Sequence, residues 1–153
     1  MNLTRQYCYF FEDDKFVETD RDGFRRRVVT GDSLQLCFWR IRGGASGSFL
    51  HHHVEHEQLG IVVRGKLDFR IGDDPDAQER VVLTEGEAYL APRSVWHGDS
   101  IFIGDDEYDE CWILDVFSPP RIDLSATGVT PSDGSPTDMT PTAGARIDPA
   151  RER

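Results

Sequence analysis

The sequence lacks the features that mark disulfide-rich secreted proteins and membrane proteins. Its three cysteines, Cys8, Cys37 and Cys111, are odd in number and widely spaced, and each lies in an apolar, strand-like run. We therefore expect buried thiols and no disulfide framework. No apolar run is long enough to cross a bilayer, and residues 1–6 lack the basic and apolar regions of a secretion signal. These absences predict a cytoplasmic protein with no membrane partner.

Positive charge is scarce as well. The chain has 17 Lys and Arg against 28 Asp and Glu, which gives a formal net charge of −11. Binding to a phosphate backbone needs a basic face, and the only basic cluster is residues 25–27. The sequence thus argues against nucleic acid as a partner.

No segment has the apolar periodicity of an amphipathic helix. Short runs rich in β-formers instead alternate with turn signals such as Gly31-Asp32. A chain of 153 residues with 38% hydrophobic content can form one domain with an apolar core. The sequence therefore predicts an all-β sandwich or barrel over residues 1–120. The expected strands are 28–30, 34–41, 58–63, 66–71, 80–83, 88–91, 101–103 and 111–117.

The two ends of the chain differ from this body. Residues 7–11 are rich in β-forming residues and precede an acidic turn, which predicts an edge strand. Because an apolar edge strand can pair with a second subunit, we expect a homodimer. After Pro119-Pro120 the composition shifts to Ser, Thr, Gly, Pro and Asp. Residues 121–153 are therefore predicted to be a disordered tail.

Residues 51–58 concentrate the side chains that bind metals, including four of the five histidines. In an extended strand His51 and His53 point to the same side, and either Glu57 or Gln58 can face the same point. His97 lies far downstream, and the fold has to bring it back. Purification tags lie at termini, whereas this run is internal. The pattern predicts a metal site.

The same residues resemble the two sequence motifs of the cupin superfamily of small β-barrels. The matches to the first motif are Gly47, His51, His53, Glu57 and Gly65. The matches to the second are Gly86, Pro92 and His97, with Ser94 where the family usually has glycine. This departure concerns the turn, because glycine adopts positive φ more easily. The match covers about residues 30 to 118 and implies a single cupin barrel of the jelly-roll type.

The resemblance implies two alternative metal shells. In the general cupin pattern Glu57 joins His51, His53 and His97, a set associated with iron, manganese or nickel. In some cupins the following amide, here Gln58, is the ligand, and strand alternation lets only one of the two point inward. With Gln58 inward, His56 shares its face and can complete a shell of four histidines and one glutamine. That shell resembles the zinc-dependent polyketide cyclases of the superfamily, of the resistomycin type.

From this resemblance we expect a metal-dependent polyketide cyclase that polarises a carbonyl for aldol ring closure and dehydration, with zinc as the expected metal. His56 is the predicted base, and Asp115 and Arg40 are weaker candidates because they are charged residues within apolar strands. Aromatic side chains that alternate into the barrel are predicted to bind a polyketide chain or aromatic intermediate, although for each residue alone core packing is the simpler explanation. They are Phe38, Phe49, Phe69, Tyr89, Trp96 and Trp112.

Two other functions stay open at this stage. The first is an iron- or manganese-dependent cupin dioxygenase or isomerase, which Glu57 as a ligand would mark. The second is a cupin that binds a sugar or another small ligand without catalysis.

Overall fold

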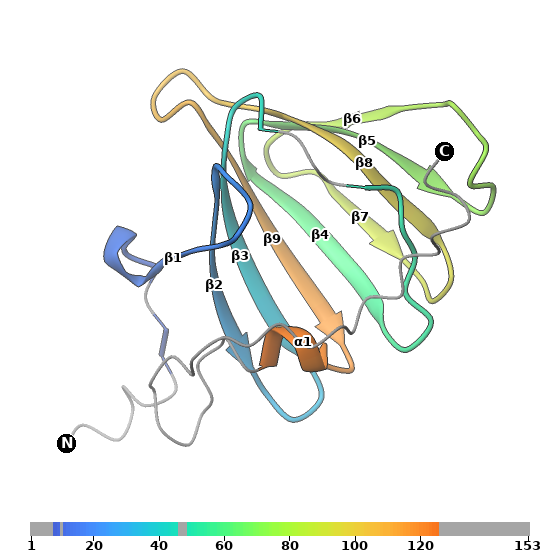
Figure 1. Ribbon diagram of the computed structural model, residues 1–153, viewed down its shortest axis with the longest axis horizontal. Coiled ribbons are helices and arrows are strands. Elements are labelled where there is room, and N and C mark those ends of the chain that lie inside the picture. Colours follow the sequence, from blue (N-terminus) through green and yellow to red (C-terminus); the bar gives the residue numbers. More distant parts are fainter. Residues whose placement is uncertain (1–7, 10, 46–48, 126–153) are drawn as a thin grey trace.

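The computed structural model describes residues 8–9, 11–45 and 49–125, and the regular secondary structure of this part is almost entirely β-strand (Figure 1). Two short helical turns flank the strands, η2 (Asp13–Lys15) and α1 (Ile122–Ser125). The strands are β1 (Val17–Glu18), β2 (Phe24–Thr30), β3 (Gln35–Arg42), β4 (Glu57–Arg64), β5 (Lys66–Gly72), β6 (Val81–Leu83), β7 (Ala88–Ala91), β8 (Trp96–Ile103) and β9 (Glu110–Ser118).

The strands form two antiparallel sheets that face each other (Figure 1). The larger sheet has the order β1-β2-β3-β9-β4-β7, and the smaller has the order β6-β5-β8. The predicted all-β class is confirmed. Strand β8 begins at Trp96, five residues earlier than the strand expected at 101, so the second motif reaches into the sheet, where His97 pairs with Ile71.

The core lies between the two sheets. The longer strands contribute alternate side chains to it, as the twofold periodicity of strands requires. Burying one such side chain stabilises the fold by roughly 1.5–3 kcal/mol. The core residues include Phe24, Ile41, Val62, Leu67, Phe69, Phe102, Cys111 and Ile113.

The outer face of β3 and β9 is covered by the segment that precedes β1. The rings of Phe11 and Phe16 lie 5.1 and 5.5 Å from that of Phe38. Arg40 pairs with Glu110 at 2.9 Å on the same face. Both faces of β3 are therefore covered. Within the predicted dimer arm, positions 7 and 10 lie outside the described residues, and the homodimer stays a prediction.

The chain continues past the predicted domain boundary at residue 120. Leu124 of α1 is only 3% exposed and packs with Val28, Cys37 and Phe117 at one end of the barrel. Residues 126–153, the rest of the predicted tail, lie outside the described residues. The helical turns that are described are all too short and too polar to cross a membrane.

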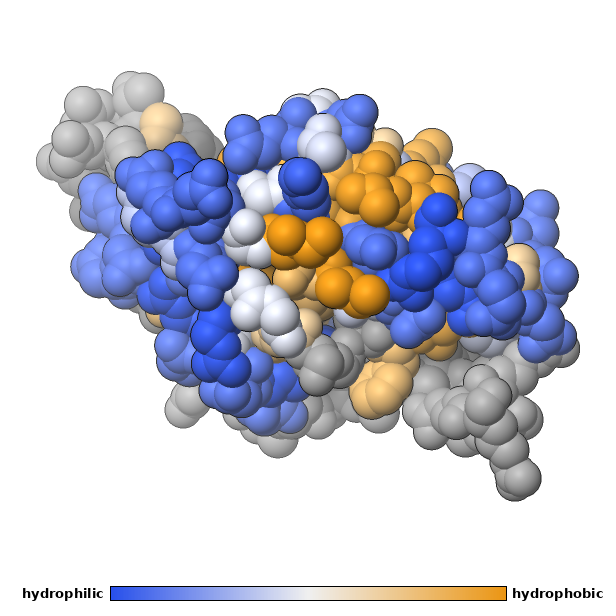
Figure 2. Space-filling model, turned by 90° about the horizontal axis from the view of Figure 1, so that it is seen from above, coloured by the Kyte–Doolittle hydropathy of each residue, from blue (hydrophilic) through white to orange (hydrophobic). Residues whose placement is uncertain are grey.

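The surface and the thiols complete the description. Cys37 and Cys111 are buried and free, as predicted, but Cys8 is exposed, because its segment lies outside the two sheets. Figure 2 shows one apolar area bordered by hydrophilic side chains. Partly exposed apolar residues include Leu59 and Leu90, which are neighbours across β4 and β7.

Candidate metal centre and adjoining cavity

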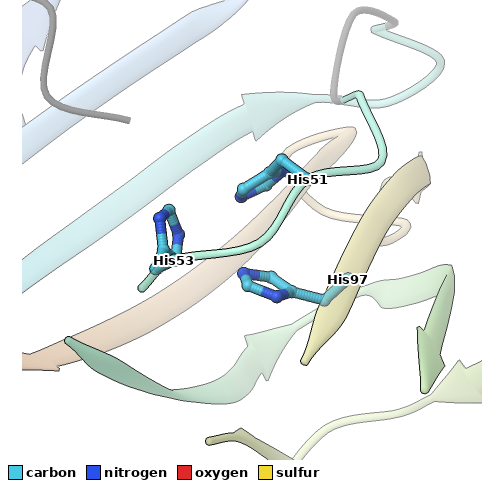
Figure 3. Close-up of side chains that lie close together, drawn as sticks. All are labelled: His51, His53 and His97. Atoms are coloured by element: carbon cyan, nitrogen blue, oxygen red, sulfur yellow. The ribbon is translucent and has the colours of Figure 1, made fainter. Parts of the chain in front are cut away.

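Three histidines from distant parts of the sequence point toward one another (Figure 3). His51 and His53 precede β4, and His97 lies on β8. One ring nitrogen of each lies within 4.8 Å of those of the other two. Two backbone hydrogen bonds of 2.9 and 2.8 Å between His51 and His97 hold the two segments side by side. The expected extended strand at residues 51–53 is reduced to this single bridge.

Two unusual backbone conformations make this approach possible. Gly98 has a φ of +123°, and a Cβ there would lie 2.1 Å from the carbonyl oxygen of Phe49, so no side chain fits. Ser94 has a φ of +68°, and its backbone N–H donates to the carbonyl of His53 at 2.7 Å. Ser94 therefore takes the left-handed conformation that glycine usually supplies, and the turn of the second motif is kept.

The hydrogen bonds of the histidines leave lone pairs on the inward nitrogens. The carbonyl of Phe49 accepts from Nδ1 of His51 at 2.7 Å, and the carbonyl of Val95 accepts from Nδ1 of His97 at 2.9 Å. A carbonyl can only accept, so Nδ1 carries the proton and Nε2 is free to donate a lone pair. Burial lowers the pKa of His97 to about 3 and also lowers the pKa values of His51 and His53. The three rings are thus neutral near pH 7, as ligation requires.

Gln58 supplies a fourth donor to this cluster. Its Oε1 lies 3.2 Å from Nε2 of His53 and 3.1 Å from Nε2 of His97. Its Nε2 donates to the hydroxyl of Tyr89 at 2.7 Å, which turns the amide oxygen toward the histidines. The neighbouring Glu57 is exposed on the other face of β4. Three neutral imidazoles and one amide oxygen fit a divalent ion such as zinc, iron, manganese or nickel.

His56 lies beside the three clustered histidines rather than among them, and its roles as a fifth ligand and as the base stay predictions. Its ring is 4% exposed and stacks 4.2 Å from that of His53 and 5.4 Å from that of Phe117. Among the described residues only His51, His53 and His97 bring their ring nitrogens together. Packing between two rings, rather than strand alternation, fixes where His56 points.

A cavity of about 140 Å³ lies between the sheets next to the histidines. His51, Gln58 and His97 form one part of its wall, and Tyr89 and Asp115 form another. The remaining wall is mostly aromatic and aliphatic. It is made by Phe24, Trp39, Ile41, Leu67, Phe69, Phe102, Ile113 and Phe117.

Tyr89 links Gln58 to Asp115 across the strands. Gly60 on β4 lies opposite Tyr89 on one side and Asp115 on the other. A Cβ at Gly60 would lie 2.1 Å from the ring of Tyr89, so only glycine lets that ring lie across β4. The hydroxyl of Tyr89 donates to Oδ1 of Asp115 at 3.2 Å. Burial raises the pKa of Asp115 to about 6 and raises that of Tyr89 further above its usual range. Asp115, a predicted catalytic residue, therefore lies where it can exchange a proton with a ligand.

Several other predicted site residues lie elsewhere. Arg40 and Trp112 are cross-strand neighbours on the outer face, where the guanidinium of Arg40 lies 4.6 Å from the indole ring, and Phe38 packs beside them. The side chain of Phe49 is 59% exposed, and Trp96 stacks 4.3 Å from His52 outside the cavity. Four of the six predicted substrate-binding residues, together with Arg40, therefore lie outside the cavity wall, and their predicted roles stay predictions. Phe69 and Tyr89 line the cavity as expected.

Two arginines of the cavity wall were missed by the sequence analysis. Arg21 lies in the turn before β2, and Arg121 lies just before α1. Arg21 stands in an acidic, polar stretch, and Arg121 stands in the segment expected to be disordered, so neither carried a local signal. Trp39 and Phe117, which also line the cavity, did carry a local signal, because each shares a strand face with another residue, Cys37 and Asp115 respectively.

Comparison with known proteins supports the fold. A family model described as "Cupin domain" matches residues 37–106. The pectin degradation protein KdgF of Dickeya dadantii is 30% identical over 117 residues, which cover 76% of this chain and 96% of that protein.

Solved structures share the architecture. KdgF from a Halomonas species aligns with a TM-score of 0.62 at 24% identity, over 76% of this chain and 98% of that one. An RmlC-like cupin from Shewanella frigidimarina aligns with a TM-score of 0.60 at 24% identity, over 76% of this chain and 96% of that one. At this identity the two structures show the fold alone.

Proposed function

The chain belongs to the cupin superfamily, and we propose that it is a metal-dependent enzyme that moves protons in the keto–enol chemistry of a small sugar acid derived from pectin. His51, His53, His97 and Gln58 would hold the divalent metal. When bound, the metal supplies a Lewis acid that polarises a carbonyl or hydroxyl oxygen and stabilises developing negative charge.

The observation that carries the proposal is the hydrogen-bonded connection from Gln58 through Tyr89 to Asp115, in the same cavity as His51 and His97. The carboxylate of Asp115 takes a proton from the carbon next to the substrate carbonyl, or returns one to it. Tyr89 keeps that carboxylate in place and fixes the amide of Gln58. The aromatic wall excludes water, so the proton passes between substrate and Asp115.

Two observations favour a small acidic sugar as the substrate. KdgF of Dickeya dadantii is a pectin degradation protein. Pectin is a polymer of galacturonate. The cavity of about 140 Å³ is small beside the roughly 300–1,000 Å³ of pockets for drug-sized ligands. A single sugar unit suits it better than an extended polycycle.

The test follows hydrogen exchange at carbon. Metal-loaded protein is incubated in D₂O with galacturonate and with the unsaturated uronates released by eliminative cleavage of pectin, and proton NMR follows deuterium uptake next to the carbonyl. We expect uptake or isomerisation with wild-type protein, and a loss of at least about 100-fold with Asp115→Asn. Asp105→Asn serves as the control, because it makes the same change at a carboxylate that lies outside the cavity wall and pairs with Arg64 at 2.7 Å. The absence of both deuterium uptake and isomerisation with all of these uronates would overturn the proposal.

The polyketide cyclase predicted from the sequence is the second candidate. Aldol closure also begins with removal of a proton next to a carbonyl, and the aromatic wall suits a flat substrate. Cyclisation of a poly-β-ketone without any exchange on uronates would favour this candidate.

A further inference from the structure

Arg21 is a charged residue of the cavity wall that the proposed chemistry does not use. It lies in the turn between β1 and β2 and lines the same cavity as His51 and His97. The chain as a whole carries a net charge of −11, which repels anions. An arginine at the cavity therefore stands out against the overall charge of the molecule.

The turn holds Arg21 in place. Its backbone N–H donates to Oγ1 of Thr19 at 3.2 Å, and its carbonyl accepts from the N–H of Phe24 at 3.1 Å. The guanidinium carbon lies 3.9 Å from the centroid of the Phe24 ring, which is 2% exposed and also lines the cavity. A cation over an aromatic face is attracted to it, so the guanidinium is positioned before any ligand arrives.

The guanidinium of Arg21 lacks a carboxylate partner. Its Nη2 is buried and makes no hydrogen bond, and no ion pair joins it to an acidic side chain within the described residues. Arg121, the other arginine of the wall, is held by both carboxylate oxygens of Asp123 at 3.1 and 2.6 Å. Burial lowers the pKa of Arg21, and the charge of Asp20 offsets this only in part. A buried N–H group of a guanidinium is costly to leave without an acceptor, and a ligand that accepts from it removes this cost.

We propose that Arg21 binds the carboxylate of the substrate and so selects acidic sugars over neutral ones. This inference rests on the proposed function for the identity of the substrate. A guanidinium presents paired N–H groups that match the two oxygens of a carboxylate. With the carboxylate fixed at Arg21, the carbonyl end of a single sugar unit is left to face His51, His97 and Asp115 in the same cavity.

The experiment compares D-galacturonate with D-galactose, which differ by the carboxylate alone. Binding of each to the zinc-loaded, full-length protein is measured by calorimetry. We expect the wild type to bind galacturonate roughly 10-fold to 100-fold more tightly, the range of a hydrogen-bonded charge pair. Arg21→Gln should abolish this preference and leave galactose binding unchanged. Arg21→Lys should keep part of it, because the charge remains without the fork of donors.

Arg42→Gln is the matched control, because it removes the same charge from an exposed residue near the turn that is paired with Asp22 at 2.6 Å. It should behave as wild type. An Arg21→Gln protein that keeps the preference while Arg121→Gln loses it would overturn the proposal in favour of Arg121. A wild type without any preference, or one that binds a sugar phosphate more tightly than galacturonate, would overturn it as well.

Failure of the proposed reaction can be distinguished from failure of the proposed carboxylate site. Zinc content and deuterium exchange are measured on the same preparations. If the protein discriminates galacturonate from galactose through Arg21 but catalyses neither deuterium uptake nor isomerisation, the carboxylate site is supported and the proposed reaction is overturned.

Discussion

At the scale of single residues, the choice between Gln58 and Glu57 sets the charge of the metal centre. Alternation along β4 turns Gln58 inward and Glu57 to solvent. The resulting donors are all neutral, so the full charge of a bound divalent ion is available to an oxygen of the substrate. A glutamate ligand would cancel part of that charge.

Removal of the Tyr89 hydroxyl tests how firmly Gln58 is held. In Tyr89→Phe the Nε2 of Gln58 loses its acceptor and Asp115 loses a donor. The amide can then rotate away from the histidines, so we expect metal affinity to fall by about 10-fold to 100-fold. Competition with a chromogenic chelator measures this. Tyr108→Phe, the same change at a residue 46% exposed, is the control, and equal affinities in the two variants would contradict the account.

Ser94→Gly should stabilise the protein. A side chain at positive φ costs about 1–2 kcal/mol, and glycine loses roughly 0.5–1 kcal/mol through its freer unfolded chain. We expect a net gain of about 0.5–1 kcal/mol in the free energy of unfolding, measured in urea. Ser94→Ala keeps the Cβ and should show no gain. A less stable glycine variant would mean that the serine side chain has a role in the turn.

At the scale of elements, the outer face of β3 and β9 is held by a network of charges. Glu110 accepts from Arg25 at 2.9 Å, from Arg40 at 2.9 Å and from the indole of Trp112 at 2.7 Å. Burial works to raise the pKa of Glu110, but these hydrogen bonds outweigh it and the pKa is lowered. Asp13, in the segment before β1, accepts from Arg25 at 3.0 Å and from Arg40 at 2.6 Å, so the network ties this segment to the sheet.

This lowered pKa gives a prediction for acid stability. A carboxylate with a depressed pKa stabilises the fold above its unfolded pKa, and the contribution is lost as pH falls through the folded pKa. Glu110→Gln should therefore cost about 1–3 kcal/mol at pH 7 and progressively less below about pH 4. Urea unfolding at several pH values measures the difference. Glu107→Gln, with a side chain 65% exposed, should cost less than about 1 kcal/mol, and an equal loss in both variants would contradict the network.

The positions of most strands along the chain were predictable, because alternation and turn residues are local signals. Which face of β3 looks inward was not. Phe38 and Arg40 on one face, and Trp39 and Ile41 on the other, are equally large, and the decision depends on Phe11 and Phe16 covering the outer face. The histidine cluster was predictable from its motif, whereas the place of His56 depends on packing against Phe117.

At the scale of the whole molecule, the two sheets meet at the histidines, since His97 belongs to the smaller sheet and Gln58 to the larger. A metal bound there joins the sheets and binds the folded state only, so it should raise thermal stability. At about 100 times its dissociation constant the gain is about 2.7 kcal/mol, which corresponds to roughly 5–10 °C in Tm. Calorimetry of chelator-treated protein with and without added zinc measures it. His97→Ala should remove the shift, and a shift that survives would place the ion elsewhere.

The sequence could not show that Arg21 and Arg121 line the cavity, because their positions depend on the fold of the whole molecule. They come from opposite ends of the described chain, and only the closed barrel brings both to one cavity. Leu124 illustrates the point, because its burial against Val28 and Phe117 fixes the segment that carries Arg121.

The most direct test of the central claim is the metal content of protein purified without a tag or added metal. We predict one divalent ion per wild-type chain, retention of the ion in Glu57→Ala, and its loss in Gln58→Ala and His51→Ala. Loss in Glu57→Ala with retention in Gln58→Ala would contradict the neutral centre described here, and with it the proposed chemistry.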